Sequence, residues 1–106
     1  MKASVLHKFG TPPTFEKIAD PVCGPNSVVI ELKACGVCRS DYHAWSGSDP
    51  DVKLPHIMGH ELAGIIAETG SGIKRFSVGD HVTVPFILGC GTVSYTHLRA
   101  HETPAN

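Results

Sequence analysis

Several features that would place the chain in other classes of protein are missing from its sequence. No run approaches the roughly 18 consecutive apolar residues that indicate a membrane-spanning helix, and residues 1–15 lack the sustained apolar stretch of a signal peptide. Nine Lys and Arg nearly balance ten Asp and Glu, giving a formal net charge of −1 without a basic cluster. The sequence therefore predicts no membrane partner, no nucleic-acid partner and a cytoplasmic location.

Long helical patterns are also missing. Only residues 39–45, RSDYHAW, suggest a helix, and a helix this short needs tertiary support. Eleven Gly and eight Pro instead separate short runs rich in β-branched residues, which lie at residues 3–7, 27–34, 62–68 and 81–88. With 106 residues, the chain is expected to form one mainly β domain, a barrel or a sandwich.

Cysteines are few, and in the cytosol we expect them to be thiols or metal ligands. Cys35-Gly-Val-Cys38 has the spacing of a redox pair or of half a zinc knuckle. The chain has no second C-x-x-C, and no long helix follows the first one, so neither reading is well supported. A catalytic zinc site, which uses three protein ligands and keeps one position open, is a further possibility for Cys38 and His60. These two residues lie 22 positions apart, so the fold would have to bring them together.

Three segments together resemble one known family. Residues 59–73 read G-H-E-x2-G-x5-G-x2-I, residues 34–43 read ACGVCRSDYH, and residues 76–82 read FSVGDHV. In this order and spacing they are similar to the signature, the zinc-cysteine segment and the GD-x-V strand of zinc-dependent medium-chain alcohol dehydrogenases. The resemblance covers about residues 1–92, and it implies a GroES-like, partly open β-barrel with one or two short helices.

For function, the resemblance implies zinc-assisted hydride transfer between a small alcohol or carbonyl substrate and NAD or NADP. In that family the cofactor is held by a following Rossmann-type domain, but no G-x-G-x-x-G is present in this chain. A third zinc-ligating cysteine of the family would also lie beyond the last residue. We therefore expect a domain fragment that is inactive alone, from an alcohol or polyol dehydrogenase that is a homodimer or homotetramer at full length.

The resemblance also implies a ligand set. Cys38 and His60 would bind the catalytic zinc, and Glu61 would lie next to the metal as a ligand or a neighbour. Successive side chains of a regular strand point to opposite faces, so His60 and Glu61 can share one metal only where the backbone is irregular. Asp41 would accept the other ring N–H of the ligating histidine, although a helix-capping aspartate is the commoner explanation of such a residue.

The remaining family roles fall on the predicted helix and its neighbourhood. Ser40 would contact the alcohol oxygen and pass its proton toward His43, which is three residues further along the same helix face. Arg39 occupies a position that contacts the cofactor pyrophosphate in some relatives. Exposed or capping roles remain open for these three residues, and Trp45 is expected in the core or along the substrate pocket.

The resemblance stops near residue 92. Gly89-Cys90-Gly91-Thr92 begins a structural zinc lobe, in which Cys90 would be the first ligand of an incomplete site, but Val93 and Thr96 stand where cysteines are expected. The run VSYTHLRAHET, residues 93–103, is also what one frame of a transposase adapter used in sequencing libraries encodes. Our hypothesis is a native domain over residues 1–92 and a non-native tail over residues 93–106.

Three other classes remain to be weighed. A zinc-free quinone reductase of the same superfamily would lack the Cys38 and His60 positions. A GroES-like co-chaperone module would need a mobile apolar loop, whereas residues 46–54 are polar, and it would leave the cysteine and histidine unexplained. A thiol redox protein would use Cys35 with Cys38.

Overall fold

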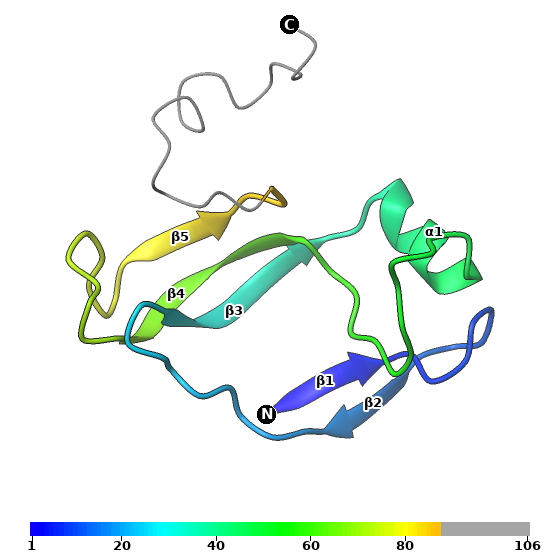
Figure 1. Ribbon diagram of the computed structural model, residues 1–106, viewed down its shortest axis with the longest axis horizontal. Helices are drawn as coiled ribbons and strands as arrows, with labels where there is room; N and C mark the ends of the chain where they lie inside the picture. The colour runs from blue at the N-terminus through cyan, green and yellow to red at the C-terminus, as the bar shows by residue number, and fades with distance from the viewer. Residues whose placement is uncertain (88–106) are drawn as a thin grey trace, which may run out of the picture.

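The computed structural model describes residues 1–87, and it is mainly β with a single helix in that range (Figure 1). The elements in chain order are β1 (Lys2–Val5), β2 (Thr14–Lys17), β3 (Val28–Gly36), α1 (Arg39–Ser46), β4 (Glu61–Thr69) and β5 (His81–Val84). The expectation of a mainly β domain with a short helix at residue 39 is confirmed. Among residues 1–87, no helix has the length and apolarity needed to cross a membrane.

The strands form two separate antiparallel sheets. β1 pairs with β2, and β3, β4 and β5 form a sheet in which β4 is central. The β3–β4 ladder slips in register at two places, between Val29 and Ile30 and between Leu32 and Ala34. Such irregularities bend a strand and increase its twist, and Figure 1 shows this long pair curving toward the helix.

Strand β2 was not predicted from the sequence. Its residues, TFEK, are almost wholly exposed, and Phe15 has 73% of its surface open to solvent. A strand with so little buried surface has no apolar alternation to reveal it. It is defined instead by its hydrogen-bonded pairing with β1, from Lys2 opposite Lys17 to Val5 opposite Thr14.

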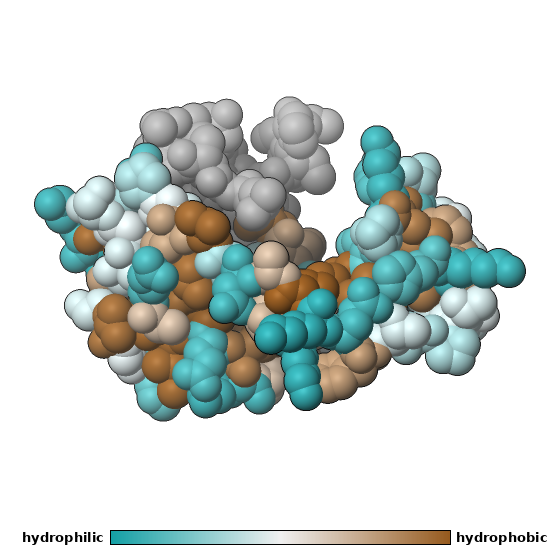
Figure 2. Space-filling model, turned by 90° about the horizontal axis from the view of Figure 1, so that it is seen from below, coloured by the Kyte–Doolittle hydropathy of each residue, from teal (hydrophilic) through white to brown (hydrophobic). Residues whose placement is uncertain are grey.

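The apolar core of the described residues is small. Leu6 and Ile66 are fully buried, and Ala3, Val5 and Ala44 are nearly so. Many larger apolar side chains remain at the surface, among them Val22, Val37, Phe86 and Tyr42. Figure 2 shows apolar and polar residues interleaved over the face seen from below. Because the burial is concentrated near β1, β4 and α1, these elements form the framework on which the candidate site is built.

Candidate metal centre

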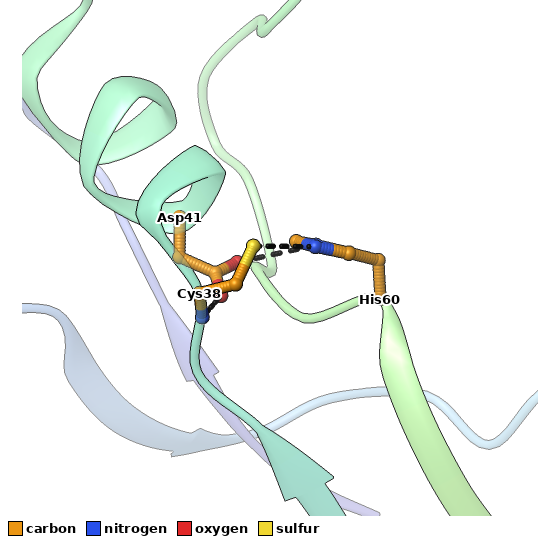
Figure 3. Close-up of side chains that lie close together, drawn as sticks. All are labelled: Cys38, Asp41 and His60. Carbon is orange, nitrogen blue, oxygen red and sulfur yellow. Dashed lines mark hydrogen bonds and ion pairs between the residues drawn. The ribbon is translucent and has the colours of Figure 1, made fainter.

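The antiparallel pairing of β3 and β4 explains how two residues distant in sequence meet. Gly36, the last residue of β3, lies opposite Glu61, the first residue of β4. Cys38 follows the end of β3 by two residues, and His60 immediately precedes β4. Strand pairing therefore delivers both side chains to the same end of the sheet, where helix α1 begins (Figure 3).

Helix α1 starts at this point because its first turn is capped. Cys38 is the N-cap residue, with extended backbone angles of φ −126° and ψ 177°. Its backbone N–H donates to Asp41 Oδ2 at 3.0 Å, which satisfies a group that the helix itself leaves unpaired. The aspartate thus fixes the backbone of the cysteine, and the capping role considered for Asp41 is present.

The same aspartate also faces the histidine. Cys38 Sγ lies 3.0 Å from His60 Nε2, while Asp41 Oδ1 lies 3.4 Å from His60 Nδ1 (Figure 3). The three residues have ligand atoms within 4.8 Å of one another. Because Asp41 approaches the ring nitrogen that faces away from the sulfur, it is placed to orient the imidazole. A thiolate and an imidazole are donors that zinc prefers, so this donor set fits zinc.

The Ser40 hydroxyl completes the polar cluster. Its Oγ lies 2.8 Å from Cys38 Sγ and 3.1 Å from His60 Nε2. Hydrogen bonds from the Ser40 side chain and backbone, followed by the interaction with His60, lower the pKa of the Cys38 thiol. The hydrogen bond to Cys38, together with the negative charges of Cys38, Asp41 and Glu61, raises the pKa of His60. Each of these two pKa shifts favours the charged form of its group, the thiolate of Cys38 and the imidazolium of His60.

Two glycines near this cluster leave room for the side chains of Cys35 and Glu61. Gly59 has φ 119°, in the left-handed region that favours glycine, and a Cβ there would lie only 2.8 Å from Cys35 Sγ. At Gly36 a Cβ would overlap Glu61 Oε2. The Glu61 side chain therefore lies over the Gly36 backbone, and it is not among the three residues whose ligand atoms converge.

A shallow cleft of about 360 Å³ opens beside the cluster. Arg39, Ser40 and His43 line it, which brings together the predicted phosphate contact and both members of the predicted proton relay. Asp49 and Pro50 complete the lining. Sequence reasoning did not single out Asp49, because it lies in an irregular segment without a motif, and only the folded chain places it beside the helix.

The other cysteines lie apart from the cluster or outside the described residues. Cys35 is exposed, and its thiol donates weakly to its neighbour's carbonyl, Gly36 O, at 3.5 Å. Cys23 lies in the turn before β3, where its thiol contacts Ser27 O at 3.4 Å. Cys90 and the rest of the expected structural zinc lobe lie outside residues 1–87. Within the described residues, the convergent metal donors are those of Cys38, Asp41 and His60.

Fold and site together define a small, mainly β domain with a candidate cysteine–histidine metal site at one end of its larger sheet. Comparison with protein families adds the affiliation: the family described as alcohol dehydrogenase GroES-like domain matches residues 24–103. The chain belongs to this family.

Individual relatives agree with that assignment. An alcohol dehydrogenase from Geobacillus stearothermophilus is 40% identical over 105 residues, which cover 97% of this chain and 31% of the relative. A cobalt- and zinc-bound thermostable alcohol dehydrogenase from Pyrobaculum aerophilum superposes with a TM-score of 0.81 at 32% identity, covering 92% of this chain and 30% of that one. The chain thus spans about a third of the length of these proteins.

The fold is also shared with a protein that has a different name and activity. A quinone oxidoreductase from Escherichia coli, solved with NADPH, superposes with a TM-score of 0.72 at 30% identity over 78% of this chain and 26% of that one. Because one fold can support different chemistries, the architecture alone does not assign a function. The convergent residues Cys38, Asp41 and His60 therefore carry the argument that follows.

Proposed function

We propose that the chain is the zinc-binding, substrate-side part of an NAD(P)-dependent alcohol or polyol dehydrogenase, in which Cys38 and His60 are two of the zinc ligands. The observation that carries this proposal is the 3.0 Å approach of Cys38 Sγ to His60 Nε2, with Asp41 on the far ring nitrogen. The alcohol dehydrogenase that matches this chain is about three times as long, and we propose that the remaining parts of the enzyme correspond to the rest of that length.

Zinc, when bound, would act as a Lewis acid on the oxygen of a small alcohol or carbonyl substrate. Asp41 would hold the proton on His60 Nδ1, so that the Nε2 lone pair faces the metal. Ser40 would hydrogen-bond the substrate oxygen, since its hydroxyl lies within 3.1 Å of both His60 Nε2 and Cys38 Sγ. His43, exposed in the same cleft, would exchange the proton with solvent.

Two further roles are proposed from family position. Arg39 would contact the pyrophosphate of NAD or NADP, since its side chain lines the cleft beside Ser40. Glu61 would stay close to the metal as a neighbouring carboxylate. The full-length enzyme is proposed to be a cytoplasmic homodimer or homotetramer.

Metal analysis of the purified 106-residue chain tests the proposal. We expect the wild-type chain to hold one zinc ion that survives dialysis. Cys38→Ser should lose the metal, and Cys35→Ser should retain it. Retention in the first variant would refute the ligand assignment. Equal loss in both variants would favour a paired-cysteine site, and redox cycling that requires both thiols would favour the thiol redox alternative. A chain that binds no zinc but captures unfolded proteins would favour a co-chaperone module.

Activity is expected only in the longer enzyme. The chain supplies part of the metal site and carries no G-x-G-x-x-G segment for the nicotinamide cofactor. The purified, zinc-loaded chain should therefore show no alcohol oxidation with NAD or NADP. Zinc-dependent turnover by these 106 residues would contradict this expectation.

The domain boundary is a separate proposal. We infer a native domain over residues 1–92 followed by a non-native tail over residues 93–106, since Val93 and Thr96 break the expected cysteine pattern. The family match runs to residue 103 and so does not itself mark the change. Codons for residues 93–103 that do not spell the adapter would end this hypothesis.

A further inference from the structure

The proposed metal ligands lie on the long segment between β3 and β4, whose position the pairing of these two strands does not fix. Residues 37–60 join β3 to β4, and they include both proposed ligands and helix α1. Helix α1 is the regular element of this connection, so contacts with other segments must fix the position of the rest. The contacts come from the segment that follows β1, residues 6–11, which we name the clamp segment.

The clamp segment contacts the C-terminal end of helix α1. Trp45 Nε1 donates to Thr11 O at 2.8 Å, and Gly10 N donates to Trp45 O at 2.9 Å. The Phe9 ring packs so closely on Gly47, which ends the helix with φ 85°, that an added Cβ would lie 3.0 Å from Phe9 Cγ. These contacts fix the helix whose N-terminal end presents Cys38.

The clamp segment also pairs with the segment that precedes His60. Leu6 and His56 form an isolated antiparallel bridge, in which Leu6 N donates to His56 O at 2.8 Å and His56 N donates to Leu6 O at 3.0 Å. Leu6 is fully buried, so this bridge is anchored in the core. Four residues further on, the chain reaches His60.

We propose that the clamp segment sets the spacing of the two ligand-bearing arms, and that Trp45 is the positioning residue through which it acts on the metal centre. The clamp segment provides none of the three convergent donors, yet it holds both arms of the connection that carries them. Releasing one arm lets Cys38 and His60 separate, and metal binding must then restore their approach. This inference rests on the proposed zinc site.

The first test compares two single-group changes on the same helix. Trp45→Phe removes the indole N–H that binds Thr11 O, whereas Tyr42→Phe removes a hydroxyl from an exposed position, 60% open to solvent. In titrations with Co²⁺ alone, we expect Trp45→Phe to weaken binding about threefold to tenfold. Tyr42→Phe should bind as the wild type does.

The visible absorption of the cobalt-saturated protein separates positioning from simple destabilisation. A displaced ligand changes the energy or intensity of the ligand-field bands, whereas loss of stability alone leaves the saturated spectrum unchanged. We expect Trp45→Phe to alter this spectrum while its far-ultraviolet circular dichroism stays that of a folded chain. A wild-type spectrum and affinity in Trp45→Phe would overturn the inference.

A second pair of variants keeps the inference testable if Trp45→Phe does not fold. Gly47→Ala and Gly79→Ala both place a side chain at positive φ, at 85° and 97°, so they carry similar backbone strain. An added Cβ meets Phe9 at Gly47 but nothing within 4 Å at Gly79. Gly47→Ala should therefore bind Co²⁺ roughly fivefold more weakly than Gly79→Ala does. Equal Co²⁺ affinities of the two variants would count against the role of the clamp segment.

Cys38→Ser distinguishes failure of this inference from failure of the proposed function. If the wild type binds Co²⁺ and Cys38→Ser does not, the proposed site stands. The two pairs of variants described above then test only the role of the clamp segment. If the wild type itself binds no Co²⁺, the proposed site fails, and the inference that rests on it fails with it.

Discussion

Two hollows on the described surface differ in the side chains that lie around them. The larger, about 490 Å³, lies on the sheet and is lined by Lys33, by residues 63–65 of β4 and by residues 81–83 of β5. The smaller, about 360 Å³, lies beside α1 next to the Cys38–His60 pair. The first hollow is larger, but within the described residues the three convergent donors, Cys38, Asp41 and His60, lie next to the second. The proposed site is therefore the place where two strand ends and the start of a helix bring polar groups together.

The most direct test of this comparison removes one imidazole from the donor cluster beside the smaller hollow and one from the lining of the larger hollow. His60→Ala should weaken zinc binding by more than about 100-fold, because a ligand is lost. His81→Ala, in the larger hollow, should leave zinc affinity unchanged. Isothermal titration with zinc measures the affinity of each variant. Equal losses of affinity would contradict the placement of the zinc site at His60.

The next largest difference in zinc affinity is expected between two aspartate variants. Asp41→Asn keeps an oxygen that can cap the helix but loses the charge facing His60 Nδ1, so zinc affinity should fall about 10- to 100-fold. Asp49→Asn, in the adjacent cleft, should change it by less than about twofold. A competition assay with a metal chelator reports both constants. An unaffected Asp41→Asn would remove the proposed orienting role.

The pH dependence of the metal-free chain follows from the two shifted groups. The lowered pKa of Cys38 contributes stability that is full above the ordinary thiol pKa and is lost as pH falls through the lowered pKa. The raised pKa of His60 contributes stability that is full below the ordinary imidazole pKa and is lost as pH rises through the raised pKa. Zinc needs the thiolate and the neutral imidazole, so its affinity should rise with pH until both Cys38 and His60 are deprotonated.

Ser40 is the largest cause of the Cys38 shift, which makes this dependence testable. In Ser40→Ala the pKa of Cys38 should rise, and alkylation of this thiol at neutral pH should slow by about threefold or more. Ser46→Ala, on the same helix, is the matched control, since its hydroxyl contacts His43 O and Ser48 instead. Peptide-resolved mass spectrometry follows each cysteine, and identical rates would contradict the assigned cause.

The smallest expected effect on the metal centre comes from the core of the sheet. Ile66 is 1% exposed, so Ile66→Val should lower the free energy of unfolding by about 1 kcal/mol. Zinc affinity of the folded chain should not change, because Ile66 lies five residues into β4 from Glu61, the strand's first residue. Val78→Ala, at an exposed position, should alter neither quantity. A changed affinity in Ile66→Val would link the core to the site.

Much of the fold could be predicted because its long strands carry local patterns. β-branched runs bounded by turn residues marked β3, β4 and β5, and residues 39–45 marked α1 to within one residue of its end. Strand β2 lacks such a pattern, because a mostly exposed strand buries no alternating face. Its existence depends on pairing with β1, which local sequence does not encode.

The candidate site was predictable in its members but not in its arrangement. Family motifs pointed to Cys38, His60 and Asp41, whose ligand atoms do converge. The placement of Glu61 over Gly36 depends on strand register, and the cleft beside Asp49 depends on the course of an irregular segment. The grip of residues 6–11 on Trp45 is a tertiary contact between segments 34 positions apart.

X-ray absorption spectroscopy of the zinc-loaded chain tests the central claim most directly. If Cys38 and His60 close one metal centre, the zinc edge data should show a single sulfur at about 2.3 Å together with imidazole nitrogen at about 2.0 Å. Cys38→Ser should hold no zinc under the same conditions, whereas Cys35→Ser should keep both the zinc and its single sulfur. Two or more sulfurs per zinc, or coordination without imidazole, would contradict the account.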